Sequence, residues 1–142
     1  MSQAMAAKLK RSLILHEGCK NFPYVDSFGN ITVGIGYNLS ARGLDNKWIA
    51  DQFLDDIYYF YSRFIEYFRW FELLDEDRQI ALIDMAFMGW KNFLTFQKML
   101  AALAIQDYET AAFEMIDSKW ARQVGARAHR VANVIITGEY DI

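Results

Sequence analysis

The residues best suited to do chemistry lie in one short stretch near the start of the chain. Glu17 and Asp26 are two carboxylic acids nine residues apart, and the hydroxyl residue Thr32 follows six residues after Asp26. A Ser-Phe-Gly-Asn turn signal separates Asp26 from a β-branched run that ends in Gly-x-Gly. This order predicts an acid at a helix end, a second acid at a hairpin and a hydroxyl on the returning strand. Paired carboxyl groups across a cleft are what hydrolysis of a glycosidic bond requires.

This spacing closely resembles the phage-type lysozymes of glycoside hydrolase family 24. The pattern of that family is Glu, eight residues, Asp, five residues, Thr, and then Val or Ile before Gly-x-Gly. Every element of the pattern is present, at Glu17, Asp26, Thr32, Val33, Gly34 and Gly36. The resemblance implies a mainly α (α+β) lysozyme-like fold. It also implies an enzyme that cleaves the β-1,4 bond between N-acetylmuramic acid and N-acetylglucosamine in peptidoglycan.

The resemblance assigns a role to each residue of the motif. Glu17 is expected to act as the general acid on the glycosidic oxygen. Asp26 is expected to stabilise the oxocarbenium-like centre and to help position water, which Thr32 holds through its hydroxyl. Catalysis then rests on positioning, proton transfer and electrostatics, without a cofactor or a metal. Substrate-binding roles are implied for four residues, Gly36, Asn38, Phe87 and Arg127.

A second stretch, near the C-terminus, carries the same resemblance. The family pattern there is Trp, two residues, Gln, three residues and Arg-Ala-x-Arg, and the matching residues are Trp120, Gln123, Arg127, Ala128 and Arg130. In relatives the first arginine faces the catalytic glutamate across the cleft. Such an arginine orients the carboxylate but also favours its charged form, so burial in the cleft must oppose this effect if Glu17 is to hold a proton. Arg127 also fits a charge on a helix surface, and Trp120 fits a core residue.

Apolar periodicity and capping residues predict the elements that position these groups. A helix over about 3–16 should end near Gly18, which places Glu17 at a helix terminus. Two strands, 22–25 and 31–36, should form the hairpin. The segment 47–74 has a helical, unusually aromatic pattern that permits a break near Asp55. The other expected features are a loop over 40–44, an Asp45 cap, and helices over about 76–88, from a Thr95 cap to 103, from Asp107 to 116, from Ser118, and over 126–137.

The length of 142 residues predicts a single lysozyme-like domain over 1–142. We expect a small hairpin lobe over about 15–50 and a helical lobe over about 51–142 that also includes the N-terminal helix. The span from Gly36 to Ala81 is shorter than in the best-known relative, which predicts a trimmed hairpin and inter-lobe helix. Tyr37 stands where many relatives have a histidine, which removes an ion pair.

Composition limits where the protein acts. No apolar run is long enough to span a membrane, and the N-terminal stretch does not read as a signal peptide. The single cysteine, Cys19, excludes an intrachain disulfide and fits a reducing compartment. The chain is therefore expected to be made in the bacterial cytoplasm. It would reach the wall after release, for example through a holin, or as part of a virion.

The net charge and its distribution restrict the classes of binding partner. The net charge is −3, and residues 45–77 carry nine acidic against three basic residues. No basic stripe is visible, which argues against a nucleic-acid partner. The expected partner is a peptidoglycan glycan strand, bound by a monomer. The acidic aromatic segment is a solvated helix face, or else an exposed patch for a partner or a lipid surface.

Two other functions fit the same residues. A lytic transglycosylase would use Glu17 alone, with the sugar's own hydroxyl as the attacking group and an anhydro sugar as the product. A non-catalytic module for binding the wall or a partner would keep the fold and use the segment 47–74 instead. The presence of Glu17, Asp26 and Thr32 argues against the second alternative.

Overall fold

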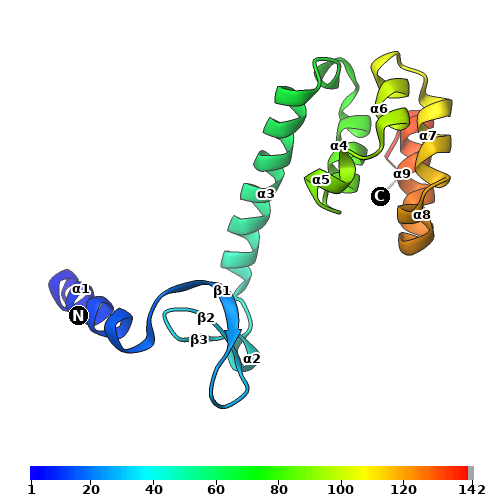
Figure 1. Cartoon of the computed structure of the whole chain (residues 1–142). Coiled ribbons are helices and arrows are strands. Elements are labelled where there is room, and N and C mark those ends of the chain that lie inside the picture. Colours follow the sequence, from blue (N-terminus) through cyan, green and yellow to red (C-terminus); the bar gives the residue numbers. More distant parts are fainter. Residues whose placement is uncertain (141–142) are drawn as a thin grey trace. The chain divides into compact units, whose positions relative to one another are not determined.

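The computed structural model describes residues 1–140 as two compact units, one from Met1 to Gln52 and one from Phe53 onward (Figure 1). The first unit holds a helix, a three-stranded antiparallel sheet and a short helix. The second unit is helical. The predicted mainly α (α+β) class is therefore confirmed, whereas the single domain over 1–142 stays a prediction.

The first unit begins with α1 (Gln3–Glu17), whose N-terminus is capped by the Ser2 hydroxyl. Gly18, at φ +75°, ends the helix, so Glu17 is its last residue as predicted. The strands β1 (Lys20–Val25), β2 (Ile31–Gly34) and β3 (Tyr37–Asn38) follow in the order β1-β2-β3. The predicted hairpin is confirmed, and β3 is an addition to it. The short helix α2 (Leu39–Arg42) occupies part of the expected loop.

A single long helix, α3 (Asn46–Tyr67), connects the sheet to the second unit. Its predicted cap is confirmed, because Asp45 Oδ1 accepts a hydrogen bond from the Trp48 backbone N–H at 2.8 Å. The break near Asp55 that the sequence permits does not occur, and no glycine or proline interrupts the helix. The helix ends before residue 74, and a 3₁₀ turn, η1 (Phe71–Leu73), follows it.

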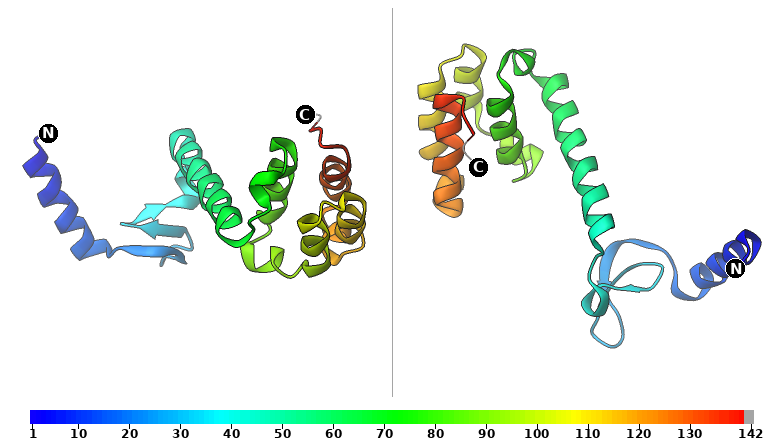
Figure 2. Two further views of the ribbon diagram at one scale, coloured as in Figure 1. Left: turned by 90° about the horizontal axis from the view of Figure 1, so that it is seen from above. Right: turned by 180° about the vertical axis from the view of Figure 1, so that it is seen from behind.

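The second unit packs its helices around an apolar core. Phe64 of α3, Phe71 and Phe93 are fully buried in this core, and Trp120 is 7% exposed. In both views of Figure 2, α7 and α9 lie side by side. The remaining helices are α4 (Glu76–Ala86), α5 (Trp90–Phe93), α6 (Gln97–Ala104), α7 (Tyr108–Ile116), α8 (Lys119–Val124) and α9 (Ala126–Thr137).

Most predicted helix caps of this unit are confirmed. The side chains of Asp75, Asp107 and Ser118 each accept a hydrogen bond from the backbone N–H three residues later. The predicted Thr95 cap is wrong, because its hydroxyl donates to the Asn92 carbonyl at 2.6 Å and α6 begins after Phe96. The Thr95 hydroxyl thus bonds to a carbonyl of the preceding turn and does not accept a backbone N–H of the following helix.

Arg78 of α4 fastens the end of α9 to the rest of the unit. Its guanidinium donates to the carbonyl oxygens of Ile135 and Ile136 at 2.8 and 2.9 Å, and it also pairs with Asp75. The guanidinium carbon lies 3.8 Å from the ring centre of Tyr108. These carbonyls belong to the last turn of α9, where the helix itself supplies no donors.

Replacing Arg78 by alanine is expected to lower the free energy of unfolding by about 3 kcal/mol, since charge-assisted hydrogen bonds to two carbonyls are lost. Chemical denaturation would measure the change. Arg122→Ala, at an exposed arginine of α8, is the matched control and should cost less than about 0.5 kcal/mol. Equal losses for the two variants would contradict the role of Arg78.

Candidate active site

Asp26 lies at the centre of a hydrogen-bonded turn between β1 and β2. Its Oδ1 atom accepts the backbone N–H groups of Phe28 at 2.9 Å and of Asn30 at 2.8 Å. The Asn30 side-chain amide donates to Oδ2 at 3.4 Å, and the Asp26 N–H donates to the Asn30 carbonyl at 2.9 Å. The turn therefore fixes the direction of the Asp26 carboxylate, because two backbone N–H groups hold one of its oxygens.

The same contacts favour the charged form of Asp26. The backbone N–H of Asn30 has the largest effect in lowering the pKa of this carboxyl below its ordinary value, and desolvation opposes it. The N–H of Phe28 and the side chains of Asn30 and Thr32 lower the pKa further. Asp26 is therefore a carboxylate at neutral and mildly acidic pH, as a group that stabilises a cationic centre must be.

Thr32 adjoins Asp26 from β2. Its hydroxyl lies 3.4 Å from Asp26 Oδ2 and 3.3 Å from the Asn30 carbonyl oxygen, and the residue is only 4% exposed. A hydroxyl has one proton to donate and two lone pairs with which to accept. Both contacts are long, so Thr32 keeps the capacity to accept a hydrogen bond from a water. The structure thus brings two residues of the predicted motif together.

Glu17 meets the sheet at Gly36. A Cβ atom at position 36 would lie 3.1 Å from Glu17 Oε2 and 3.2 Å from its Cγ, closer than nearly all such contacts. Gly36 also has φ +66°, a conformation that side chains disfavour. Glycine at this position therefore lets the Glu17 side chain lie against the backbone that follows β2. Within the first unit, the Glu17 side chain is exposed to solvent.

Two other predicted residues of the first unit have structural contacts. Asn38 is the cross-strand partner of Thr32, and its side-chain oxygen accepts the Ala41 N–H at 2.9 Å to cap α2. Tyr37 donates its hydroxyl to the Gly43 carbonyl at 2.7 Å. The Arg42 guanidinium stacks on the Tyr37 ring. Asn38 is thus beside the candidate site, although its amide serves a helix.

The remaining predicted residues, Phe87 and Arg127, belong to the second unit. Phe87 is 42% exposed, and its ring lies 5.0 Å from that of Phe60. Arg127 forms an ion pair with Asp84 and also donates to the Asp84 carbonyl oxygen at 2.8 Å. The Tyr140 hydroxyl donates to the other Asp84 oxygen at 2.9 Å. Substrate contacts of Phe87 and Arg127 stay predictions.

Sequence reasoning missed the groups that orient these side chains. Asn30 holds Asp26, and the Asp-Ser-Phe-Gly-Asn sequence is a turn signal that could have revealed this contact. Asp84 pairs with Arg127 across 43 residues of sequence, and Tyr140 holds Asp84 across 56 residues. No short-range pattern marks such a pairing, so it could not be read from the sequence.

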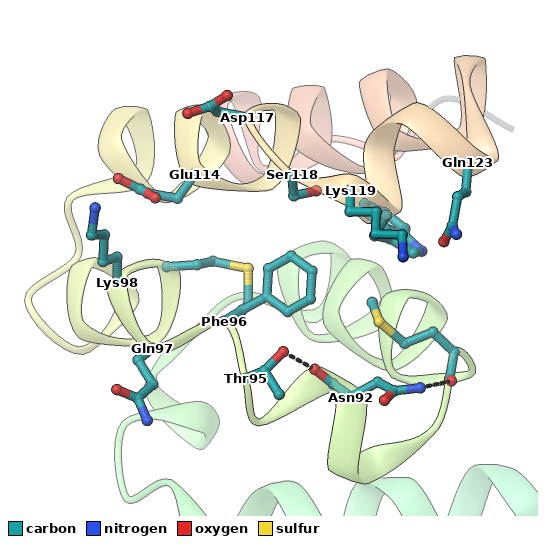
Figure 3. A pocket seen from close by; sticks show the side chains of 13 residues that line it. Asn92, Thr95, Phe96, Gln97, Lys98, Glu114, Asp117, Ser118, Lys119 and Gln123 are labelled. Atoms are coloured by element: carbon teal, nitrogen blue, oxygen red, sulfur yellow. Dashed lines mark hydrogen bonds between the residues drawn. The ribbon is translucent and has the colours of Figure 1, made fainter.

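A large pocket of about 810 Å³ lies in the second unit (Figure 3). Phe96 occupies its middle and meets Trp120 edge to face at 6.4 Å. Gln123 also lines the pocket, so two residues of the C-terminal motif lie here. The lining carries both signs of charge, from Lys98, Lys119, Glu114 and Asp117. None of the seven predicted site residues lines this pocket.

Comparison with known proteins gives relatives for about half of the chain. It is 42% identical over 66 residues to probable T4-type lysozyme 1 of Dictyostelium discoideum, and 38% identical over 66 residues to probable T4-type lysozyme 2 of that organism. Each match covers 46% of this chain and 39% of the relative. The resemblance to T4-type lysozymes is confirmed. No family model matches the chain.

A further relative of this lysozyme-like chain is the pre-baseplate central spike protein Gp5 of Enterobacteria phage T4. The two are 38% identical over 71 residues, which are 49% of this chain and 12% of the spike protein. The chain therefore spans well under half the length of each of these three curated relatives.

Within residues 1–140, no group of three or more His, Cys, Asp and Glu side chains is arranged to hold a metal ion. In the same range, no helix has both the length and the apolar character that crossing a membrane demands.

Acid titration tests the environment of Asp26. A carboxylate with a lowered folded pKa contributes stability above its unfolded pKa of about 3.9, and this is lost as the pH falls through the folded value. Asp26→Asn should therefore lose less stability than wild type on acidification below about pH 4. Carbon-13 NMR of the Asp26 carboxyl should show a pKa below the ordinary value.

Thr32→Val removes one donor to the Asp26 carboxylate and should raise the Asp26 pKa. Ser27→Ala, at an exposed position in the same turn, is the control and should leave the Asp26 pKa unchanged. An Asp26 carboxyl that titrates above 3.8, the ordinary value, would contradict the assigned hydrogen bonds.

Proposed function

We propose that this protein is a peptidoglycan hydrolase of lysozyme type, which cleaves the β-1,4 bond between N-acetylmuramic acid and N-acetylglucosamine and so lyses cell walls. The observation that carries the proposal is the pairing of motif and geometry in the first unit. Asp26 is held as a carboxylate by backbone N–H groups, Thr32 adjoins it, and Glu17 lies against Gly36. The similarity to T4-type lysozymes supports the same activity.

The two carboxyl groups receive different environments, which is what acid catalysis of glycoside cleavage needs. Glu17 ends α1 beside Gly36 and is exposed in the first unit, so its carboxyl can approach the glycosidic oxygen of a bound glycan. Asp26 has backbone N–H donors and stays charged. The negative charge of Asp26 then stabilises the oxocarbenium-like centre as the bond breaks.

Thr32 completes the reaction by holding water. Its hydroxyl lies between Asp26 Oδ2 and the Asn30 carbonyl oxygen, at contacts long enough to be exchanged for a water. A water that donates to the carboxylate of Asp26 and to Thr32 is activated and directed at the sugar carbon by the same pair. Asn30 serves this step indirectly, because it fixes the carboxylate.

The charged pocket of the second unit suits another part of the same substrate. Glycan strands of peptidoglycan carry short peptides that bear both carboxylates and amines. Lys98 and Lys119 can pair with the carboxylates, and Glu114 and Asp117 with the amines. Phe96, packed on the largely buried Trp120, adds an apolar part to the lining. This part of the proposal accounts for the placement of Trp120 and Gln123 in the pocket lining.

Glu17→Gln is expected to reduce the lysis rate by about 10²–10⁴-fold, because an amide cannot donate the proton to the glycosidic oxygen. Turbidity loss of permeabilised Gram-negative cells measures the rate, and circular dichroism checks the fold. Glu72→Gln, at an exposed acid of η1, is the control and should keep wild-type activity. A Glu17→Gln variant that retains more than about a tenth of the wild-type rate would refute the assignment.

The product is expected to have an inverted anomeric centre. Water held by Asp26 and Thr32 attacks from the face opposite the leaving group, which requires the two carboxyl groups to be about 6.5–9.5 Å apart. NMR of the first-formed product should show the α-anomer. The β-anomer would contradict the water-holding role, and products ending in an anhydro sugar would identify a lytic transglycosylase instead.

A further inference from the structure

A smaller pocket of about 350 Å³ lies in the first unit, on a different face of the sheet from Thr32. Val33 and Tyr37 line the pocket and are cross-strand partners on β2 and β3. Successive side chains of a strand project to opposite faces, so Val33 and Tyr37 project away from the face that carries Thr32. The pocket is thus a separate feature of the unit that holds Glu17 and Asp26.

Two parts of the pocket wall, the Tyr37 side chain and the Trp48 backbone, are held by contacts within the first unit. The Tyr37 hydroxyl donates to Gly43, and Arg42 covers one face of its ring at 4.4 Å from the centre. The Trp48 backbone is tied to Asp45 in the first turn of α3, while its side chain stays 48% exposed. Trp48 therefore offers an aromatic face to a ligand on a backbone that does not need to be ordered by binding.

Polar groups stand beside these aromatic walls. The lining includes the ammonium of Lys20, the amide of Asn21 and the carboxylate of Asp45. The Lys20 ammonium lies 4.2 Å from the ring centre of Tyr24, which limits where it can point. Together these groups can donate and accept hydrogen bonds, and they carry both signs of charge.

We propose that this pocket is a second saccharide site, which binds one sugar ring of a glycan strand apart from the bond that is cleaved. A pyranose has an apolar face of C–H groups and an edge of hydroxyl or acetamido groups. The Trp48 ring matches that face, and Lys20, Asn21 and Asp45 match that edge. The volume is at the small end of ligand pockets, as a single sugar ring demands.

A sugar fits these residues better than an apolar protein segment does. An apolar side chain would pack on Val33, Tyr37 and Leu44 but would strip water from Lys20, Asn21 and Asp45 without replacing its hydrogen bonds, which is costly. The mixed charges also disfavour a phosphate polymer, which would meet the carboxylate of Asp45. The hydroxyl groups of a sugar can both donate to Asp45 and accept from Lys20 and Asn21.

The assignment of a glycan rests on the proposed function, since a wall polymer repeats the same sugars many times. A second contact with such a polymer raises the effective concentration of the enzyme at its substrate without altering the reacting groups. The second site should therefore matter for whole sacculi and not for short soluble fragments, which offer few sugars for a second contact.

Binding of the inactive Glu17→Gln protein to purified sacculi tests this inference. Adding Trp48→Ala should weaken binding by about tenfold, as loss of a tryptophan contact to a bound partner does, and Trp48→Phe should retain most of the affinity. Ile49→Ala is the matched control, because Ile49 is the next residue of α3, is 49% exposed and does not line the pocket. When Glu17 is left intact, the Trp48→Ala variant should hydrolyse short soluble fragments at the wild-type rate.

The outcomes separate this site from the proposed activity. Unchanged sacculus binding by Trp48→Ala, or an equal loss in Ile49→Ala, would overturn the second site. An equal loss of fragment hydrolysis in a folded Trp48→Ala protein would also overturn it, because the pocket would then belong to the reacting centre. If the wild-type protein cleaves no fragment while sacculus binding still depends on Trp48, the proposed activity fails and the saccharide site stands.

Discussion

The hydrogen-bonded turn at Asp26 is the constraint on which the rest of the candidate site depends. Two backbone N–H groups fix one carboxylate oxygen, and the other oxygen faces Asn30 and Thr32. The same turn sets the register of β1 with β2, and β2 then sets the position of β3 and of Gly36. A disturbance of the turn would therefore displace the ionised acid, the hydroxyl and the glycine that accommodates Glu17.

Charge compensation differs between the two sets of predicted site residues. In the first unit, neutral backbone donors hold Asp26, so its negative charge stays available to a cationic centre. In the second unit, Asp84 neutralises Arg127, and Tyr140 holds the second oxygen of Asp84. Arg127 is thus a hydrogen-bond donor of fixed direction whose charge is compensated by Asp84. It would orient a ligand through hydrogen bonds more than attract it through net charge.

Local signals explain how much of the fold and site could be predicted. Glu17 at a helix end, the hairpin and the caps at Asp45, Asp75, Asp107 and Ser118 each depend on contacts a few residues apart, so the sequence reveals them. Thr95 failed as a cap because its hydroxyl had a nearby competing acceptor. The pairing of Arg127 with Asp84 and both pockets arise from packing of distant segments, which no local pattern encodes.

Distribution of charge, more than its total, decides how such a protein meets an anionic wall polymer. The chain carries −3 overall, yet residues 1–44, which include Glu17, Asp26 and Thr32, hold five basic and two acidic residues. Interactions between exposed charges fade over about 8–10 Å at physiological salt, so a polymer bound to the first unit responds mainly to the charges near it. Four of the nine acidic residues of 45–77 lie in α3, and three more lie at the start of α4, at 75–77. A net negative protein can therefore present a locally basic segment to an anionic polymer, and the overall charge is no argument against a wall polymer as ligand.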